Sequence, residues 1–288
     1  MSQDQTRADL WTVRTPSGAR ICRRQGDRYE RVRTPWLREQ ASLLLLFVSN
    51  DFRARYRAQA MGVIWSLLQP LVMMSILSLI FSRLRASEPN YPVLLLIGLL
   101  VWQWVSQALN ASTISFVLNA DMVKRTVFPR ALLPLASVLS YGLNALVESI
   151  VVLAMIPFFP RAFQVSGSLL AIPGLLLCLV LLLAGVALAA SVLNVIYRDV
   201  AYLVSTSLLL IYWLTPVIYL PTDPPERWRP ILALNPLSGI ITGLREAIVH
   251  GAAPSLLDWA RIVGPTFVIL LLGIGLFRHF EREMLDHV

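Results

Sequence analysis

Long apolar runs dominate the chain from residue 61 onward. Six of them contain about 20 residues or more, which is the length that an α-helix needs to cross about 30 Å of hydrocarbon. The six predicted spans are residues 61–81, 92–118, 131–159, 168–196, 201–220 and 259–277. The pattern therefore predicts an all-α integral membrane protein, with six transmembrane helices in residues 61–288.

A shorter amphipathic pattern precedes the first span. Apolar side chains recur there at steps of three, four and four, at Leu45, Val48, Phe52 and Tyr56. Arg53 and Arg57 share another face of the same helix, and Asp51 stands four residues before Arg55. Residues 36–60 are therefore predicted to form a helix along the cytoplasmic membrane interface, where its arginines meet lipid phosphates or a protein partner.

Residues between the fifth and sixth spans form a second amphipathic segment. Its apolar positions fall at spacings of three and four, at Ile231, Leu234, Leu237, Ile240, Ile241, Leu244 and Ile248. Pro236, Gly239 and Gly243 interrupt the segment, so it is too short and too broken to cross the bilayer. We expect residues 231–250 to form re-entrant helices buried against protein in the outer leaflet. An amphipathic helix lying on the outer surface fits the pattern equally well.

Positive charge is concentrated on one side of the predicted membrane domain. Most of the 25 Lys and Arg residues lie in the first 60 residues, in the link over residues 119–130, at Arg198 and in the tail. Since Lys and Arg favour the cytoplasmic side, both termini are predicted to be cytoplasmic. The head, residues 1–35, is polar and arginine-rich, and we expect it to be a loosely ordered cytoplasmic extension.

The composition agrees with a membrane protein. Hydrophobic residues make up 56% of the chain and charged residues 15%, and the mean hydropathy is +0.64. Soluble domains contain about 25% charged residues. The net charge of +8 does not indicate nucleic-acid binding, because no aromatic–basic sheet or helix-turn-helix pattern accompanies it.

Motifs for catalysis or nucleotide binding are absent from the sequence. His250, His279 and His287 lack metal-ligand spacing, and neither a G-x-S-x-G elbow nor a G-x-x-x-x-G-K-[ST] phosphate loop occurs. We therefore predict a chain that is not an enzyme and holds no metal or cofactor. Its energy has to come from another chain or from a gradient.

Glu148 is the acidic residue nearest the middle of a predicted span. An ionisable group in a membrane is a candidate functional residue, and the alternative is a carboxyl that bonds to Asn144 one helical turn away. Other polar side chains in the spans are Gln69, Gln103, Gln107, Asn110 and Asn194. A proton-coupled carrier usually needs more ionisable groups, so a gradient-driven carrier has little support in this sequence.

Five motifs carry a family resemblance. They are DFRARYRAQAMGVIWSLLQP from Asp51, VKRTVFPRALLPL from Val123, NVIYRDV from Asn194, TPVIY from Thr215 and NPLSGIITGLR from Asn235. In this order they resemble ABC-2 type permeases that export polysaccharides, the Wzm and teichoic-acid-export permeases. The resemblance begins near residue 40 and runs to the end of the chain.

The resemblance implies a fold, a set of partners and a function. Permeases of this kind have the ABC-2 (type V exporter) fold, form homodimers in the bacterial inner membrane and pair with two copies of a separate ABC ATPase subunit, which holds ATP and Mg. The implied substrate is a lipid-linked polysaccharide, such as O-antigen or teichoic acid on undecaprenyl diphosphate, which crosses between the two halves. The alternatives are a capsular polysaccharide permease and an ABC-2 exporter of a drug or lipid.

Candidate residues fall into three groups. The resemblance implies that the surface coupled to the ATPase comprises Asp51, Arg53, Arg55, Arg57, Lys124, Arg125, Phe128, Arg130, Arg198 and Asp199. Aromatic rings stack on sugars, and with the intramembrane carboxyl they give the translocation-path candidates Trp65, Tyr141, Glu148, Tyr212 and Tyr219. The implied exit-gate candidates are Asn235, Pro236, Gly239, Gly243 and Arg245. If the fifth span is one helix, Tyr212 and Tyr219 share a face because they are seven residues apart.

Overall fold

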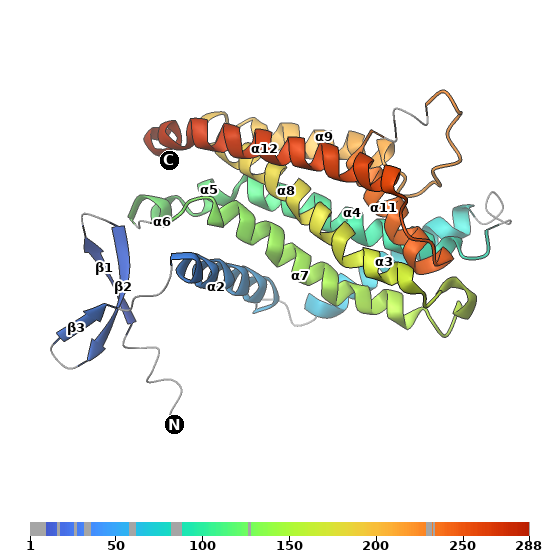
Figure 1. The fold of residues 1–288 in the computed structure, drawn as a ribbon, viewed down its shortest axis with the longest axis horizontal. Coiled ribbons are helices and arrows are strands. Elements are labelled where there is room, and N and C mark those ends of the chain that lie inside the picture. Colours follow the sequence, from blue (N-terminus) through green and yellow to red (C-terminus); the bar gives the residue numbers. More distant parts are fainter. Residues whose placement is uncertain are drawn as a thin grey trace.

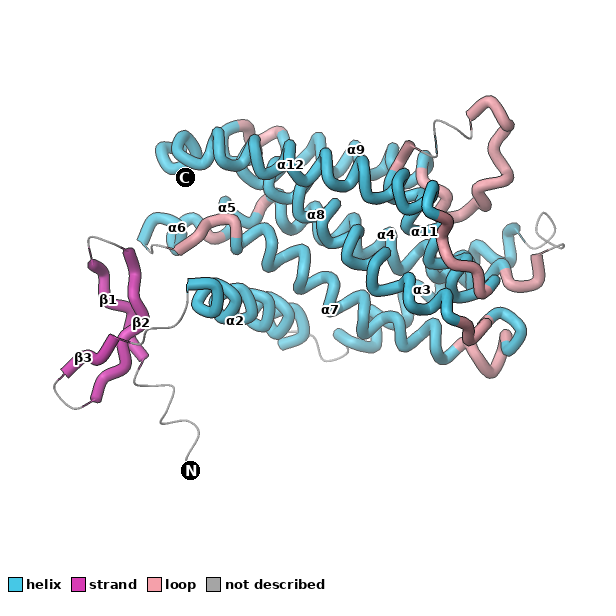
Figure 2. Tube along the Cα trace, in the orientation of Figure 1, coloured by secondary structure: helices cyan, strands magenta, loops and turns pink. Residues whose placement is uncertain are grey.

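The protein is seen here as a computed structural model that describes residues 10–15, 18–25, 28–31, 36–57, 62–81, 88–125, 128–228, 232 and 234–287. Its helices run side by side along the long axis of the molecule (Figures 1 and 2). The N-terminal strands and the C-terminal end of the last helix lie at one end of this bundle, which we call the terminal end. The opposite end is called the distal end.

The head contains a small antiparallel sheet. Strands β1 (Leu10–Thr15), β2 (Gly18–Gln25) and β3 (Arg28–Arg31) pair in the order β1-β2-β3. The expectation of a loosely ordered head is therefore wrong for these strands, and the all-α class applies only to the rest of the described chain. β-branched and aromatic residues such as Trp11, Val13 and Ile21 favour strands. The overall polar, arginine-rich composition of the head does not reveal this local preference.

Thirteen helical elements follow the sheet in the described chain. They are α2 (Trp36–Arg57), α3 (Gly62–Phe81), α4 (Tyr91–Thr113), α5 (Ser115–Leu118), α6 (Ala120–Arg125), α7 (Leu132–Ala154), the 3₁₀ turns η1 (Pro160–Ala162) and η2 (Gly167–Leu170), α8 (Ala171–Ile196), α9 (Val200–Leu214), α11 (Pro236–Arg245), the π-helical turn η3 (Glu246–His250) and α12 (Leu256–His287). The predicted interfacial helix thus corresponds to α2.

Four of these helical segments are long and apolar enough to cross a membrane: Tyr91–Thr113, Leu132–Ala154, Gly167–Ile196 and Leu256–Glu281. They occupy the predicted second, third, fourth and sixth spans. The first and fifth predicted spans contain shorter apolar helices, Trp65–Phe81 and Val200–Leu214. The fifth ends early because Thr215 is extended (φ −101°, ψ 137°) in front of Pro216, whose ring excludes the helical conformation for the preceding residue.

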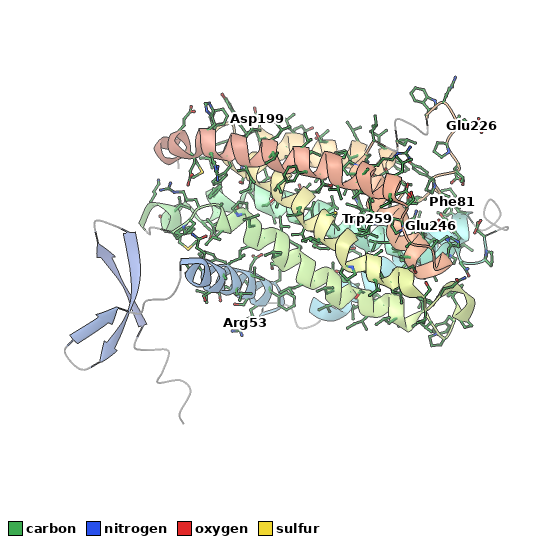
Figure 3. All side chains as sticks on the ribbon, viewed as in Figure 1. Arg53, Phe81, Asp199, Glu226, Glu246 and Trp259 are labelled. Atoms are coloured by element: carbon green, nitrogen blue, oxygen red, sulfur yellow. The ribbon has the colours of Figure 1, made fainter. Side chains whose placement is uncertain are left out.

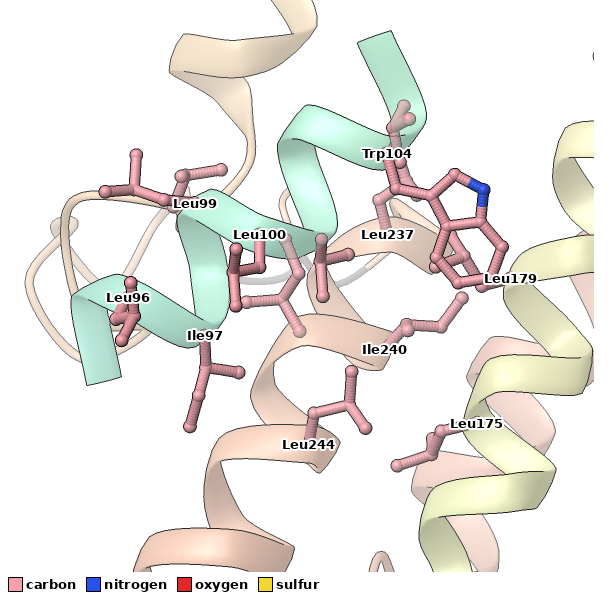
Figure 4. Packing of buried hydrophobic residues seen from close by; sticks show 14 of the residues in the cluster. Leu96, Ile97, Leu99, Leu100, Trp104, Leu175, Leu179, Leu237, Ile240 and Leu244 are labelled. Atoms are coloured by element: carbon pink, nitrogen blue, oxygen red, sulfur yellow. The ribbon is translucent and has the colours of Figure 1, made fainter. Parts of the chain in front are cut away.

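The core forms around α4. Leu94, Leu95 and Leu96 are at most 2% exposed, and α4 packs against α3, α7, α8, α9 and α11. On the α11 side, Leu237, Ile240 and Leu244 lie between α4 and α8 (Figure 4). At the terminal end a second cluster joins α5 to α12 through the stacked rings of Phe116 and Phe277, whose centroids are 6.2 Å apart.

The backbones of helices α8 and α12 lie in close contact at two glycines. A Cβ added to Gly185 would lie 2.7 Å from Leu270 Cα, and one added to Gly273 would collide with the carbonyl oxygen of Gly185. Small residues allow this kind of close backbone contact between membrane helices. The contact fixes the position of α12 along α8.

We predict that Gly185→Ala forces the two helices apart, because the obstructing atoms belong to backbone that cannot rotate away. Overpacking of this kind costs about 1–3 kcal/mol of stability. Gly275→Ala is the matched control, since a Cβ at Gly275 meets nothing within 4 Å. Thermal unfolding of the purified variants should show a lower melting temperature for Gly185→Ala alone. Equal melting temperatures for the two variants would mean that this contact does not limit packing.

Candidate functional site

The candidate site is a groove of about 540 Å³ along α4, bounded by α3 and α9. The α4 side chains that line it are Trp102, Gln103, Ser106, Gln107 and Asn110, with Leu99. The polar members recur at steps of three, one and three, which places them on one face of the helix. From the other walls, α3 contributes Gln69, Pro70 and Met73, and α9 contributes Ser205, Leu208, Leu209 and Tyr212.

Hydrogen bonds hold the polar groups of the groove in place. The Ser205 hydroxyl donates to Asn110 Oδ1 at 2.8 Å, and this bond connects α9 to α4. The Asn110 amide in turn donates to the Ser106 carbonyl at 2.8 Å. The groove therefore presents fixed amide and hydroxyl groups along a helix that is otherwise apolar.

Two aromatic rings meet in the groove. The centroids of Trp102 and Tyr212 are 5.2 Å apart, with the ring planes tilted by 52°. The Trp213 ring lies edge-on to Tyr212 with centroids 5.4 Å apart, but Trp213 is 63% exposed and lines a different hollow, with Tyr219. Tyr212 is thus the aromatic residue of α9 that faces the groove.

Glu148 lies behind the groove wall, on α7. Its side chain is 1% exposed, and its Oε1 accepts hydrogen bonds from Asn144 Nδ2 at 2.6 Å and from Gln103 Nε2 at 3.3 Å. The hydrogen bond to Asn144 that the sequence suggested is therefore present. The carboxyl also orients Gln103, so it acts on the groove through a neighbouring amide.

The other path candidates lie elsewhere. Trp65 is 61% exposed on α3, and the ring of Tyr141 lies under the Arg55 guanidinium, whose Cζ is 3.4 Å from the ring centroid. Tyr219 lies beyond the end of α9, so it cannot share a helix face with Tyr212, and that prediction is wrong. Among the five path candidates, only Tyr212 lines the groove.

Side chains of the coupling group divide between exposed and inward positions. Arg53, Lys124, Arg198 and Asp199 are exposed, and Figure 3 shows Arg53 and Asp199 on the outside of the bundle. Arg130 instead pairs with Glu281 of α12 at 3.6 Å, and Phe128 packs on Phe47 of α2 with centroids 5.5 Å apart. Arg57 and Arg125 lie outside the residues whose side chains are described.

Arg55 connects α2 to α7. Its Nη2 lies 2.9 Å from Asp51 Oδ2 and donates to the Ser140 hydroxyl at 2.6 Å, while its plane covers Tyr141. A planar cation suits this combination of stacking and hydrogen bonding. Together with the Phe47–Phe128 contact, Arg55 fixes α2 against the first turns of α7.

The gate candidates lie along α11, and Arg245 at its C-terminal end is 3% exposed. Its Nε donates to the Leu94 carbonyl at 2.7 Å, its Nη1 to that of Pro216 at 2.7 Å and its Nη2 to that of Val217 at 2.6 Å. The segment after α9 is irregular and buried at residues 215–217, so its carbonyl groups need such partners. Arg245 is therefore the internal hydrogen-bond partner of this segment.

The remaining gate candidates begin helix α11 and allow it to pack closely against α8 and α12. Asn235 caps the helix by accepting from Leu237 N at 3.0 Å, and its amide donates to Thr215 Oγ1 at 2.9 Å. Pro236 occupies the first turn, where its missing N–H has no cost. A Cβ on Gly239 would lie 2.7 Å from Ile262, and one on Gly243 3.1 Å from Leu175.

The sequence shows Gln69, Gln103, Gln107 and Asn110 as polar residues of the predicted spans, but it does not show that they line one groove. Their signal was present, because polar residues recur at 103, 106, 107 and 110 within an apolar span. Within the described residues, no group of three or more His, Cys, Asp or Glu side chains is placed to hold a metal ion.

We predict that Arg245→Met destabilises the protein, because the buried carbonyl groups of Pro216 and Val217 lose their donor at once. Each unsatisfied buried group costs about 1–3 kcal/mol. Arg227→Met, at an exposed arginine of the loop after α9, is the matched control and should leave the melting temperature unchanged. Hydrogen exchange across residues 215–219 should accelerate in Arg245→Met alone. Unchanged exchange there would show that these bonds do not hold the segment.

Comparison with known proteins identifies the family of the chain. The ABC-2 type transporter family matches residues 42–249. The chain is 31% identical over 246 residues to an O-antigen export system permease protein RfbA of Klebsiella pneumoniae, covering 85% of this chain and 94% of that protein. An RfbA of Myxococcus xanthus is 27% identical over 88% of this chain and 97% of its own length. The polysialic acid transport protein KpsM of Escherichia coli is 22% identical over 82% of this chain and 92% of its own length. The resemblance drawn from the motifs is thus confirmed, and the chain belongs to the ABC-2 type transporter family of integral membrane proteins.

Proposed function

We propose that this chain is the transmembrane subunit of an ATP-driven exporter that moves a lipid-linked polysaccharide out of the cytoplasm. The observation that carries the proposal is the polar groove on α4. Hydrocarbon cannot satisfy the amides of Gln69 and Gln107, which line the groove, so this face needs a polar occupant. Rows of hydroxyl groups on a glycan supply the matching donors and acceptors.

The proposed topology has six spans with both termini in the cytoplasm of a bacterial inner membrane. The terminal end of the bundle is then cytoplasmic, in agreement with the excess of Lys and Arg there. Between the last two spans, α11 and η3 enter the outer leaflet as re-entrant helices. The burial of α11 against α4, α8 and α12 supports this arrangement, because irregular backbone at membrane depth has to be covered by protein.

In the proposed assembly two copies of the chain face each other, and each groove forms half of a channel. A glycan longer than the membrane is thick has to slide in steps. The rings of Trp102 and Tyr212 tolerate such sliding, because stacking depends weakly on position, while Gln107 and Asn110 hold a sugar between steps.

Energy enters from two copies of a separate ATPase subunit, which holds the ATP and Mg. The exposed charges at the terminal end, Arg53, Lys124, Arg198 and Asp199, form the surface proposed to meet it. Arg55 is proposed to pass motion of α2 to α7, because it binds both helices. Motion of α7 is then proposed to reach the groove through Glu148, because this α7 residue accepts a hydrogen bond from Gln103 in the groove wall.

Two substrate alternatives remain for experiment. A capsular polysaccharide has a precedent in the name of the 22% identical relative, whereas O-antigen export is named for the 31% identical one. A drug or lipid exporter would not need the row of amides on α4. The groove therefore favours a glycan over an apolar substrate.

The groove can be tested with two neighbouring serines of α9. Ser205→Leu places an apolar side chain in the groove, whereas Ser207→Leu changes an exposed serine that does not line it. We expect Ser205→Leu to lower surface polysaccharide roughly tenfold, the effect of losing about 1.4 kcal/mol of binding. Immunoblots of membranes should show both variants at wild-type levels. Full export by Ser205→Leu would remove the groove from the path.

The coupling surface can be tested by reversing its charge. Lys124→Glu with Arg198→Glu should weaken co-purification with the ATPase subunit and lower the ATP hydrolysis of the complex severalfold, because both residues are exposed at the terminal end. Arg227→Glu, in the loop after α9, is the control and should change neither measurement. Wild-type hydrolysis coupled to full export in the double variant would contradict this assignment.

A further inference from the structure

A second hollow, of about 470 Å³, opens at the distal end of the bundle. It lies between α11, the start of α12 and the segment after α9, and it is separate from the groove on α4. Its walls include Tyr219, Thr242, Glu246, Ala253, Asp258 and Arg261. A volume of this size lies within the range of about 300–1,000 Å³ that is usual for small-molecule sites.

The lining combines one aromatic ring with several hydrogen-bonding groups. Tyr219 and three prolines give apolar walls, while Thr242, Glu246, Asp258 and Arg261 supply a hydroxyl, two carboxylates and a guanidinium. Two carboxylates beside one guanidinium repel a phosphate group. The same carboxylates accept strong hydrogen bonds from neutral hydroxyl groups.

The hollow has a fixed frame. Asp258 Oδ2 accepts from the Ser255 backbone N–H at 3.0 Å and from its hydroxyl at 2.7 Å, and Ser255 Oγ accepts from Asp258 N at 3.2 Å. Glu246 pairs with His250 Nδ1 at 3.1 Å, and its carbonyl accepts from Ala252 N at 3.1 Å. Gly251 closes this turn with φ of 66°, a conformation that glycine adopts without strain.

Contacts from the α7–α8 link brace the same turn. Gln164 N donates to the Ile248 carbonyl at 3.0 Å, and the Ser168 hydroxyl donates to the Ala247 carbonyl at 2.9 Å. A frame that is ordered before binding reduces the entropy that a ligand has to lose. The carboxylates of the hollow are thus held where a ligand would meet them.

From this geometry we infer that the distal hollow is a saccharide-binding site, which holds one or two neutral sugar units of the glycan after they leave the channel. The inference rests on the proposed function. A polymer that slides in steps can slip back whenever the ATPase resets. A sugar held at the distal end resists that return, so the site gives export its direction.

Filling the hollow tests the inference. Ala253 is an exposed loop residue that lines it, and Ala253→Trp occupies the space without disturbing a helix. Ala260→Trp adds the same side chain at an exposed position of α12 that does not line the hollow. The assembled permease–ATPase complex, in lipid nanodiscs, is titrated with lipid-free oligosaccharides made by partial acid hydrolysis of the glycan that the host cell exports.

Binding should be at least tenfold weaker for Ala253→Trp than for the wild type and Ala260→Trp, and ATP hydrolysis should be equal in all three. In cells, Ala253→Trp should lower export severalfold per ATP hydrolysed. Equal oligosaccharide binding by Ala253→Trp and Ala260→Trp would overturn the inference, as would glycerol phosphate binding that only Ala253→Trp abolishes. A wild-type complex that exports no glycan would overturn the proposed function itself. That outcome differs from equal oligosaccharide binding by the two variants, which would overturn only the saccharide site.

Discussion

The distal half of the structure depends on one buried arginine. Arg245 stands at the end of α11 and donates to carbonyl groups of two other parts of the chain, Leu94 on α4 and Pro216 and Val217 after α9. A Cβ on Gly98 would collide with Nη2 of Arg245, so the glycine in α4 leaves room for the guanidinium. The guanidinium has five donors in a fixed plane, which allows it to serve an irregular segment that no helix or sheet completes. The Tyr91 hydroxyl adds a bond to the Ile218 carbonyl at 2.8 Å.

A second constraint governs the middle of the bundle, where polar groups have to be paired with one another or with a polar occupant. Glu148, Asn144 and Gln103 satisfy the first condition, since they bond among themselves between α4 and α7. Gln107 and Ser106 belong to the groove, which is open. The boundary between the buried network and the open groove passes through Gln103, which takes part in both. A change at Glu148 therefore alters the groove without touching a substrate.

Much of the fold could be predicted from apolar runs, because a helix that crosses a membrane has to be both long and apolar. Four of the six predicted spans matched long helices, and the interfacial helix matched α2. The end of α9 was missed although Thr215–Pro216 carried the signal, since hydropathy continues smoothly across a proline. The inward turn of Arg55 could not be predicted, because its partners Ser140 and Tyr141 lie 85 and 86 positions away in sequence. Sequence could name the polar residues of the groove, but only packing brings α3, α4 and α9 together.

Because α9 ends early, the hydrocarbon layer of the membrane beside it is expected to be thin. With 15 residues, α9 is about 22 Å long, shorter than the roughly 30 Å of a typical hydrocarbon core. α9 forms one side of the groove. Bilayers adapt to short helices by thinning locally, at a modest energetic cost. A polymer in this groove would therefore cross a thinner layer of hydrocarbon than the full-length helices α8 and α12 define, and fewer of its sugars would lose water at any moment.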